Sequence, residues 1–329
     1  MSDTVLVTGG AGYIGSHTCK ALARAGYRPV TYDNLVSGHR WAVRWGPLEI
    51  GDILDSIRLS AVMKTHRPAA VIHFAAFAYV GESITEPAKY YRNNVAGSQV
   101  LLDVMRAHDI NQIVFSSSCA TYGVPDRLPI TEDTPQSPIN PYGRTKLMVE
   151  RMLADYGAAY GLRSVALRYF NAAGADPDGD TGEDHEPETH LLPLVLEAAA
   201  GLRPDFTILG DDYATPDGTC IRDYVHVGDL AQAHVLALRS LRGSKDSTSY
   251  NLGNGAGYSV AQIIDAARQV TGREIKVKRG PRRPGDPAIL VADASKARRD
   301  LGWRPEFPAI DKIVGSSWDW LLRHRQSGK

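Results

Sequence analysis

Three polar side chains in the middle of the chain have the types and spacing needed for proton transfer. Tyr142 and Lys146 stand four residues apart, which places both side chains on one face of a helix. An ammonium beside a phenol favours the phenolate, so we expect Lys146 to lower the pKa of Tyr142 from about 10. Tyr142 would then act as a general base. Ser118 follows an apolar run, and its hydroxyl would pass the proton of a substrate hydroxyl to Tyr142.

The position of these residues decides between chemistry and ordinary surface structure. A tyrosine–lysine pair taken alone is more often an exposed helical pair, and a serine cluster is more often turn material. Ser116-Ser117-Ser118, however, comes directly after a predicted strand at residues 112–115. The carboxyl end of a strand is where doubly wound folds bind their ligands, which favours the functional interpretation.

A glycine-rich stretch near the N-terminus supplies a cofactor motif. A β-branched run at residues 4–8 leads into glycines that fit both Gly10-x-Gly12-x-x-Gly15 and Gly9-x-x-Gly12-x-x-Gly15, and a helical pattern follows. Such a turn lets a phosphate approach bare backbone at a helix N-terminus. Asp33 ends the next apolar strand, 18 residues beyond Gly15, where a carboxylate takes ribose hydroxyls and repels a 2′-phosphate. The motif predicts NAD rather than NADP.

Strand and helix signals alternate along the first half of the chain, with strands at 4–8, 29–32, 48–52, 70–76, 112–115 and 163–168, and helices at 55–65, 87–108 and 142–160. This alternation predicts an α/β fold, a doubly wound parallel sheet of the Rossmann type. Shorter, mixed elements follow residue 171 and predict a smaller mixed α/β C-terminal lobe. We therefore expect an NAD-binding domain at 1–170, rejoined by part of 219–245, and a second lobe at 171–329, with a cleft between them.

Composition narrows the functional class. Lys plus Arg and Asp plus Glu each total 37, so the net charge is zero, which argues against nucleic acid and membrane surfaces as partners. The first strand begins too early for a signal peptide, and three scattered cysteines favour free thiols, so we expect a cytoplasmic protein. Asp176-x-Asp178-x-Asp180 resembles the start of a calcium loop, but Thr181 and Pro187 replace the glycine and glutamate that such a loop needs. No metal site is expected.

Nearly end to end, the chain resembles the extended short-chain dehydrogenase/reductase family, and within it the UDP-glucose (UDP-galactose) 4-epimerases. The glycine turn and the serine, tyrosine and lysine residues carry part of this resemblance. Further motifs, in family order, are Gly51-Asp52-Ile53, His73-Phe74-Ala75-Ala76, Val80-Gly81-Glu82-Ser83, Asn93-Asn94-Val95, Leu167-Arg168-Tyr169-Phe170-Asn171, Arg222-Asp223-Tyr224 and Arg282-Arg283-Pro284-Gly285-Asp286.

The resemblance implies an NAD-dependent isomerase that inverts C4 of a UDP-sugar through a transient 4-keto sugar. Ser118, Tyr142 and Lys146 would be catalytic. The residues implied to hold NAD are Gly9, Gly12, Tyr13, Ile14, Gly15, Asp33, Asn34, Asp52, Ile53, Phe74, Ala75, Ala76, Asn94, Ser116, Tyr142, Lys146 and Phe170. Those implied to hold the UDP-sugar, mostly in the C-terminal lobe, are Ser118, Tyr142, Asn171, His190, Leu191, Arg222, Tyr224, Arg283, Asp286 and Leu290.

Two positions depart from the family pattern. Ala78 stands where many members have a lysine that helps hold the cofactor, so we expect NAD to be held less tightly here. His190 stands where many members have asparagine. The resemblance also implies a homodimer, formed through the helices at 87–108 and 142–160 as a four-helix bundle.

The sugar stays open at this stage. Leu290, intermediate in size at a position that limits the turning sugar, favours UDP-glucose and UDP-galactose. A UDP-pentose or UDP-N-acetylhexosamine 4-epimerase is an alternative, and a catalytically idle NAD-binding module is an alternative of another class. A 4,6-dehydratase would need carboxylates where Cys119 and Ala120 stand.

Overall fold

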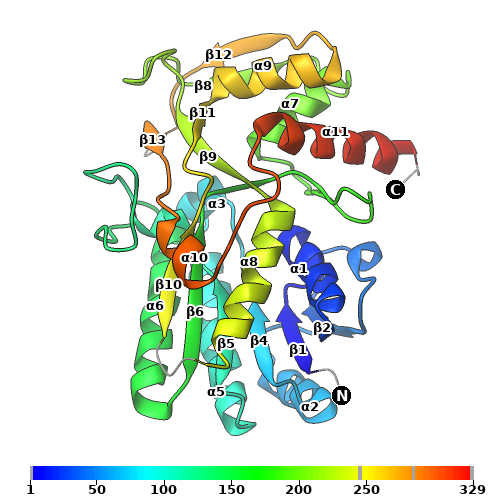
Figure 1. The fold of residues 1–329 in the computed structure, drawn as a ribbon, viewed down its shortest axis with the longest axis vertical. Coiled ribbons are helices and arrows are strands. Elements are labelled where there is room, and N and C mark those ends of the chain that lie inside the picture. The colour runs from blue at the N-terminus through cyan, green and yellow to red at the C-terminus, as the bar shows by residue number, and fades with distance from the viewer. Residues whose placement is uncertain (1–2, 244–246, 284–285, 327–329) are drawn as a thin grey trace.

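Seven parallel strands form the large sheet of the computed structural model, which describes residues 3–243, 247–283 and 286–326 (Figure 1). The strand order is β10-β6-β5-β4-β1-β2-β3, so the chain reverses direction across the sheet between β1 and β4. The strands are β1 (Thr4–Thr8), β2 (Arg28–Asp33), β3 (Leu48–Ile50), β4 (Ala70–His73), β5 (Gln112–Ser116), β6 (Arg163–Tyr169) and β10 (Thr248–Leu252). The predicted doubly wound parallel sheet is confirmed, and the β1/β4 boundary is its ligand-binding switch point.

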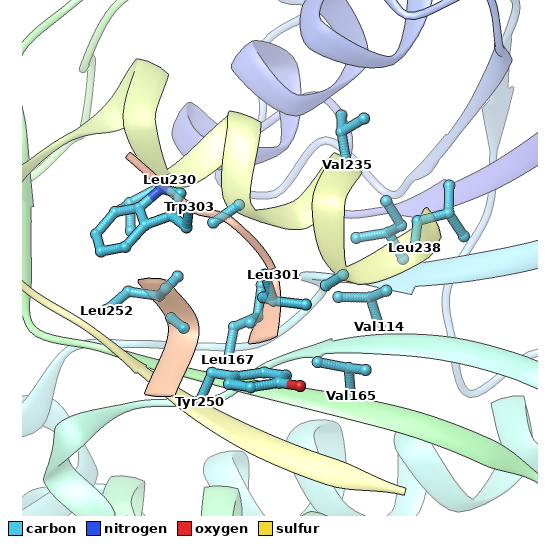
Figure 2. Close-up of a cluster of buried hydrophobic side chains, with 14 of the residues drawn as sticks. Val114, Val165, Leu167, Leu230, Val235, Leu238, Tyr250, Leu252, Leu301 and Trp303 are labelled. Atoms are coloured by element: carbon cyan, nitrogen blue, oxygen red, sulfur yellow. The ribbon is translucent and has the colours of Figure 1, made fainter. Parts of the chain in front are cut away.

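Helices cover both faces of this sheet, which explains the near-continuous apolar runs of its strands. On one face lie α1 (Tyr13–Arg24), α8 (Val227–Ser240) and α10 (Ser295–Asp300), and on the other α2 (Ser56–His66), α5 (Gly97–Ala107) and α6 (Pro141–Tyr160). Figure 2 shows the first interface, where Val165 and Leu167 of β6 face Leu230 and Leu238 of α8. Trp303 is fully buried in the same cluster, and its indole donates to the Asp229 carbonyl at 2.9 Å.

A second group of elements lies at the top of the molecule in Figure 1. β9 (Ile221–His226) pairs with β7 (Asn171–Ala173), β11 (Gly257–Ser259) and β13 (Ile289–Leu290), while β8 (Phe206–Leu209) pairs with β12 (Val277–Gly280). The helices α7 (Leu191–Ala199), α9 (Val260–Thr271) and α11 (Ile310–Gln326) share an apolar cluster with these strands. After β9 the chain returns to the large sheet as α8 and β10.

The long helix predicted at 87–108 is divided. The structure has α4 (Pro87–Tyr90), a π-helical turn η2 (Tyr91–Ala96) and then α5, preceded by α3 (Val80–Thr85). Such π turns interrupt helices at sites that need a particular side chain placed inward, and here Asn94 is the buried residue of η2. Two short 3₁₀ turns, η1 (Arg40–Ala42) and η3 (Cys119–Thr121), complete the elements. Within the described ranges, no helix is long and apolar enough to cross a membrane.

Candidate functional site

The glycine turn lies at the switch point of the large sheet. The carbonyl of Thr8, the last residue of β1, accepts hydrogen bonds from the backbone N–H groups of Phe74 at 2.8 Å and Ala75 at 3.1 Å, just beyond β4. Gly9 has φ +73°, and a Cβ there would lie 2.6 Å from the Ala75 nitrogen. A Cβ at Gly15 would lie 2.1 Å from the Gly9 carbonyl oxygen. Only glycine fits these two positions.

The N-terminus of α1 is arranged to receive an anion. Gly12 precedes the helix. Within the described residues, no side chain caps the free N–H groups of α1, and its first turn contains no acidic residue. A Cβ at Gly12 would come within 4 Å of one described atom, the Gly9 oxygen at 3.4 Å. The positive end of a helix with open backbone in front of it suits a phosphate.

Asp33 ends β2 against this turn. Its carboxylate accepts hydrogen bonds from the backbone of Ala11 at 3.0 Å and of Leu35 at 2.8 Å. Burial raises the pKa of this carboxyl, and the two backbone donors oppose the shift. Beside it, the Asn34 amide donates to Asp52 at 3.0 Å, and buried Ile53 follows. The structure thus places four of the residues predicted to hold NAD next to one another.

The proton-transfer residues converge at the carboxyl end of β5. The Asn140 side chain caps α6 by accepting from the Gly143 N–H at 2.8 Å, and this places Tyr142 and Lys146 in the first two turns. Lys146 Nζ donates to the Ser116 carbonyl at 2.7 Å and lies 5.8 Å from the centre of the Tyr142 ring. Ser118 caps η3 and hydrogen-bonds the Tyr142 side chain.

The pKa values at this point correct one expectation from the sequence. Burial raises the pKa of Tyr142 to about 12, although the Ser118 hydrogen bond opposes the shift. Burial also lowers the pKa of Lys146 to about 7, and Glu150 opposes that shift. The expectation that the Tyr142 pKa is lowered is wrong for this structure, because desolvation of the buried phenol raises it.

A buried polar network supports the serine cluster, and the sequence analysis did not identify its centre, Glu150. Ser117 donates to Glu150 at 2.5 Å, and Glu150 forms an ion pair with Arg168 at 2.6 Å, with both side chains buried. Arg168 also donates to the Tyr122 hydroxyl at 2.9 Å. One signal in the sequence was available, since Glu150 stands one helical turn beyond Lys146.

Two residues predicted to hold NAD use their side chains within the protein. The buried Asn94 amide accepts from the Phe77 N–H at 2.9 Å and donates to the Phe77 carbonyl at 3.0 Å. It thereby fixes the segment that leaves β4. The Ser116 hydroxyl is hydrogen-bonded to the Tyr169 hydroxyl. Both side chains therefore stabilise the segments that surround the site.

The predicted sugar-nucleotide residues gather around β9. Asn171 of β7 pairs in register with Tyr224, and Leu290 of β13 pairs with Arg222. Leu290 packs in a buried cluster that also contains Phe170 and Cys119, the residue after Ser118. Segments that are far apart in sequence thus meet near Ser118.

The charged residues of this group differ in exposure. The buried Arg222 guanidinium forms an ion pair with Asp286, whereas Arg283 is exposed. Pro284 and Gly285, part of the same sequence motif, lie outside the described residues.

The loop between β7 and α7 carries two charged clusters. The carboxylates of Asp176, Asp178 and Asp180 converge on the Lys20 ammonium at 2.5, 2.8 and 2.8 Å, so a lysine lies at the centre of this acidic triad. His190, directly before Leu191 and α7, donates from Nδ1 to Glu183 at 2.5 Å. His185 and Glu188 lie in the same cluster. Of its four members the sequence analysis identified only His190, although the Glu-x-His-x-x-Glu-x-His spacing was visible.

Comparisons with known proteins agree with this fold. The model of the NAD dependent epimerase/dehydratase family matches residues 5–253. A UDP-glucose 4-epimerase of Rhizobium leguminosarum bv. trifolii is 53% identical over 324 residues, covering 98% of this chain and 99% of the relative. The crystal structure of UDP-glucose 4-epimerase from Brucella ovis in complex with NAD is 57% identical, with TM-score 0.94 over 97% of this chain and 98% of that chain. The Stenotrophomonas maltophila enzyme with bound NAD and formylated UDP-arabinopyranose is 41% identical, with TM-score 0.95 over 99% of both chains.

Proposed function

Because the chain belongs to the NAD dependent epimerase/dehydratase family, we propose that it inverts C4 of a UDP-hexose and interconverts UDP-glucose and UDP-galactose, with NAD as cofactor. One observation carries the proposal: Ser118, Tyr142 and Lys146 converge, buried, at the carboxyl edge of the sheet that carries the glycine turn. That edge is where a doubly wound fold holds nucleotide and substrate together.

The residues present fit NAD. The uncapped α1 N-terminus with open backbone at Gly12 suits the pyrophosphate, and Asp33 suits the adenosine ribose. Bound NAD supplies a reversible oxidation at the sugar C4 and a cationic ring, while the protein supplies position and electrostatics.

Tyr142 moves the proton in this scheme. Its hydroxyl, hydrogen-bonded to Ser118, accepts the proton of the sugar 4-hydroxyl as C4 is oxidised and returns it to the oxygen of the inverted product. The proton thus stays within the site, and no net acid or base is consumed. Lys146 is anchored on the Ser116 carbonyl, so its charge lies at a fixed place below the phenol ring. The burial of all three side chains keeps bulk water from the 4-keto sugar.

The residues around β9 are suited to hold the UDP moiety while the sugar turns. Arg222, with its fork of N–H donors, is apt for a diphosphate, and Asn171 and Tyr224 lie in register beside it. We assign His190, Leu191, Arg283 and Asp286 to the same UDP-binding group. An anchor of this kind, remote from C4, leaves the oxidised ring free to present its other face.

A dehydratase reaction is disfavoured by the residues next to Ser118. Cys119 and Ala120 stand there, and burial raises the pKa of the Cys119 thiol to about 12. A thiol that stays protonated at neutral pH supplies neither the acid nor the base that water elimination needs.

The test is turnover of UDP-glucose by purified protein without added reductant, followed by separation of the UDP-sugars. We expect UDP-galactose to appear until the two sugars reach equilibrium. NAD binding without any turnover would instead indicate the idle NAD-binding module. The same assay with UDP-N-acetylglucosamine and UDP-xylose decides between the hexoses and the alternative sugars.

We also propose a homodimer formed through α5 and α6. In these helices Leu101 and Leu147 are buried inside the subunit, whereas Met148 is 40% exposed and available to a partner copy. Sedimentation at micromolar concentration is expected to show twice the 35.8 kDa chain mass, and a monomer would contradict the proposal. Three buried free thiols, Cys19, Cys119 and Cys220, support the cytoplasm as its location.

A further inference from the structure

Four side chains with metal-binding atoms meet in the loop between β7 and α7. Glu183, His185, Glu188 and His190 each turn one ligand atom toward the others, and these atoms all lie within 4.8 Å of one another. None of the four belongs to the proton-transfer group, and His190 uses Nδ1 in this cluster, which leaves its other ring nitrogen for the UDP contact proposed above.

Their separations approach those of a tetrahedral site. His185 Nδ1 lies 3.4 Å from Glu183 Oε1 and 3.5 Å from Glu188 Oε2, and His190 Nδ1 lies 3.8 Å from Glu188 Oε1. Zinc bonds of about 2.0–2.1 Å in a tetrahedron place neighbouring ligand atoms about 3.3–3.4 Å apart. The separation between His190 Nδ1 and Glu183 Oε1 is shorter, at 2.5 Å. The His190 side chain is 48% exposed, so its ring has room to rotate and open that distance.

The positive charges of the cluster are its own two imidazoles, because Glu183 and Glu188 outweigh the effect of burial and raise the pKa of His185 to about 10 and also that of His190. The side chains of Glu183 and Glu188 are only 7% and 8% exposed, yet within the described residues neither has an ion pair with lysine or arginine. The nearby acidic triad differs, because Lys20 lies at its centre. His185 Nδ1 is buried and forms no well-aligned hydrogen bond, although it is directed at both carboxylates. A divalent cation would take the place of the protons on the two imidazoles, since histidine binds a metal in its neutral form.

We propose that Glu183, His185, Glu188 and His190 bind one zinc ion, or a similar divalent d-block cation, in a closed structural site. Two imidazoles with two carboxylates suit zinc, whereas calcium and magnesium prefer oxygen ligands alone. Glu188 is already oriented, since one of its oxygens accepts from the backbone N–H groups of Thr189 at 2.6 Å and His190 at 2.7 Å. Supported ligands of this kind are typical of metal sites.

The place of the cluster indicates what the ion would stabilise. The His185 ring lies 6.3 Å from the ring of Tyr13, the first residue of α1, and 6.0 Å from that of Tyr79, centre to centre. The Glu183 carbonyl accepts from the Trp320 indole of α11 at 3.0 Å. A bound ion would therefore stabilise the irregular loop between β7 and α7, which lies between the glycine turn and α11. It would also fix the start of α7.

The experiment uses the untagged full chain, stripped of metal with a chelator and dialysed. Zinc is titrated by calorimetry, and zinc content is measured by mass spectrometry after gel filtration. We expect one zinc per chain and a thermal midpoint that rises with added zinc. His185→Gln and Glu188→Gln should weaken zinc binding by more than about a hundredfold, while Asp178→Asn in the acidic triad should not weaken it.

Cobalt(II) gives a readout that does not depend on the variants folding. Its visible absorption in the wild-type chain should show the intense bands of tetrahedral coordination, and zinc should displace it. If the wild-type chain takes up no zinc and shows no tetrahedral cobalt spectrum, shared protons hold the cluster together and the proposal is wrong. Equal zinc binding by wild type and His185→Gln would also overturn it. Neither readout involves a UDP-sugar, so failure here leaves the proposed epimerase activity untouched.

Discussion

Replacing Gly12 with alanine separates the structural demands on the glycine turn from its cofactor-binding role. Gly12 has φ −83° and ψ 177°, which any residue adopts, and an added Cβ would be in ordinary contact with the Gly9 oxygen at 3.4 Å. The fold should therefore tolerate Gly12→Ala and gain about 0.4–1 kcal/mol from the reduced freedom of the unfolded chain.

NAD affinity should respond in the opposite sense. The new methyl group occupies open space in front of the α1 N-terminus, where a phosphate would meet the free N–H groups. Losing one charge-assisted hydrogen bond costs about 1.5–3 kcal/mol, which corresponds to roughly a 10- to 150-fold rise in Kd.

Two further variants serve as controls that separate effects on folding from effects on NAD binding. Gly15→Ala would place a Cβ 2.1 Å from the Gly9 oxygen, so it should lower both the free energy of unfolding and NAD affinity. Gly81→Ala, where the added Cβ meets open space, should leave NAD affinity unchanged. The assays are calorimetric NAD titration of nucleotide-free protein and urea unfolding. Wild-type NAD affinity in Gly12→Ala would refute the assignment of this backbone to the pyrophosphate.

Three other predictions follow from the same structure. The free energy of unfolding should fall as the pH drops from 6.5 toward 4. Four buried histidines, whose pKa values are lowered to about 3–4, stay neutral in the folded protein but bind protons when it unfolds. An equal urea midpoint at pH 7 and pH 5 would contradict this prediction. These histidines are His17, His73, His226 and His234. Leu290→Ala should raise the turnover of UDP-N-acetylhexosamines relative to UDP-hexoses, and Leu290→Tyr should lower it, since even one methylene of overfill costs about 1–3 kcal/mol. An unchanged turnover ratio in both variants would show that Leu290 does not line the sugar pocket. Ala78→Lys should strengthen NAD binding by about tenfold through one added charge-assisted hydrogen bond, and calorimetry showing no gain would exclude that contact.

Local patterns were sufficient to predict six of the seven strands of the large sheet, whereas β10 lies in the range predicted for the second lobe. The run from Thr4 to Thr8, its glycines and the alternation of strands and helices are dictated by neighbours in sequence, and all appear where expected. β7, β9, β11 and β13 were not predicted. Three of them have only two or three residues, too few to show a period, and the six residues of β9 include Arg222 and Asp223 rather than a continuous apolar run. The 87–108 helix is interrupted where the Asn94 side chain hydrogen-bonds the backbone of Phe77, a tertiary contact that no local pattern shows.

In the candidate site, too, local features were predicted from the sequence and features that depend on tertiary contacts were not. The spacing of Tyr142 and Lys146 was enough to place them together, and their meeting with Ser118 followed from strand order. Their pKa values depend on burial, which is a property of the whole fold, so the sequence predicted the wrong direction for Tyr142. Glu150 was missed for a similar reason, because its partner Arg168 comes from a different element.

The most direct test of the account is the turnover of UDP-galactose by Tyr142→Phe. Removing only the hydroxyl oxygen should lower turnover by about a hundredfold or more, while NAD content and the thermal midpoint stay close to those of the wild type. Tyr160→Phe, at a half-exposed tyrosine at the end of the same helix, serves as the matched control and should retain full activity. Turnover by Tyr142→Phe within a few-fold of the wild-type rate would contradict the claim that this phenol moves the proton of the sugar 4-hydroxyl.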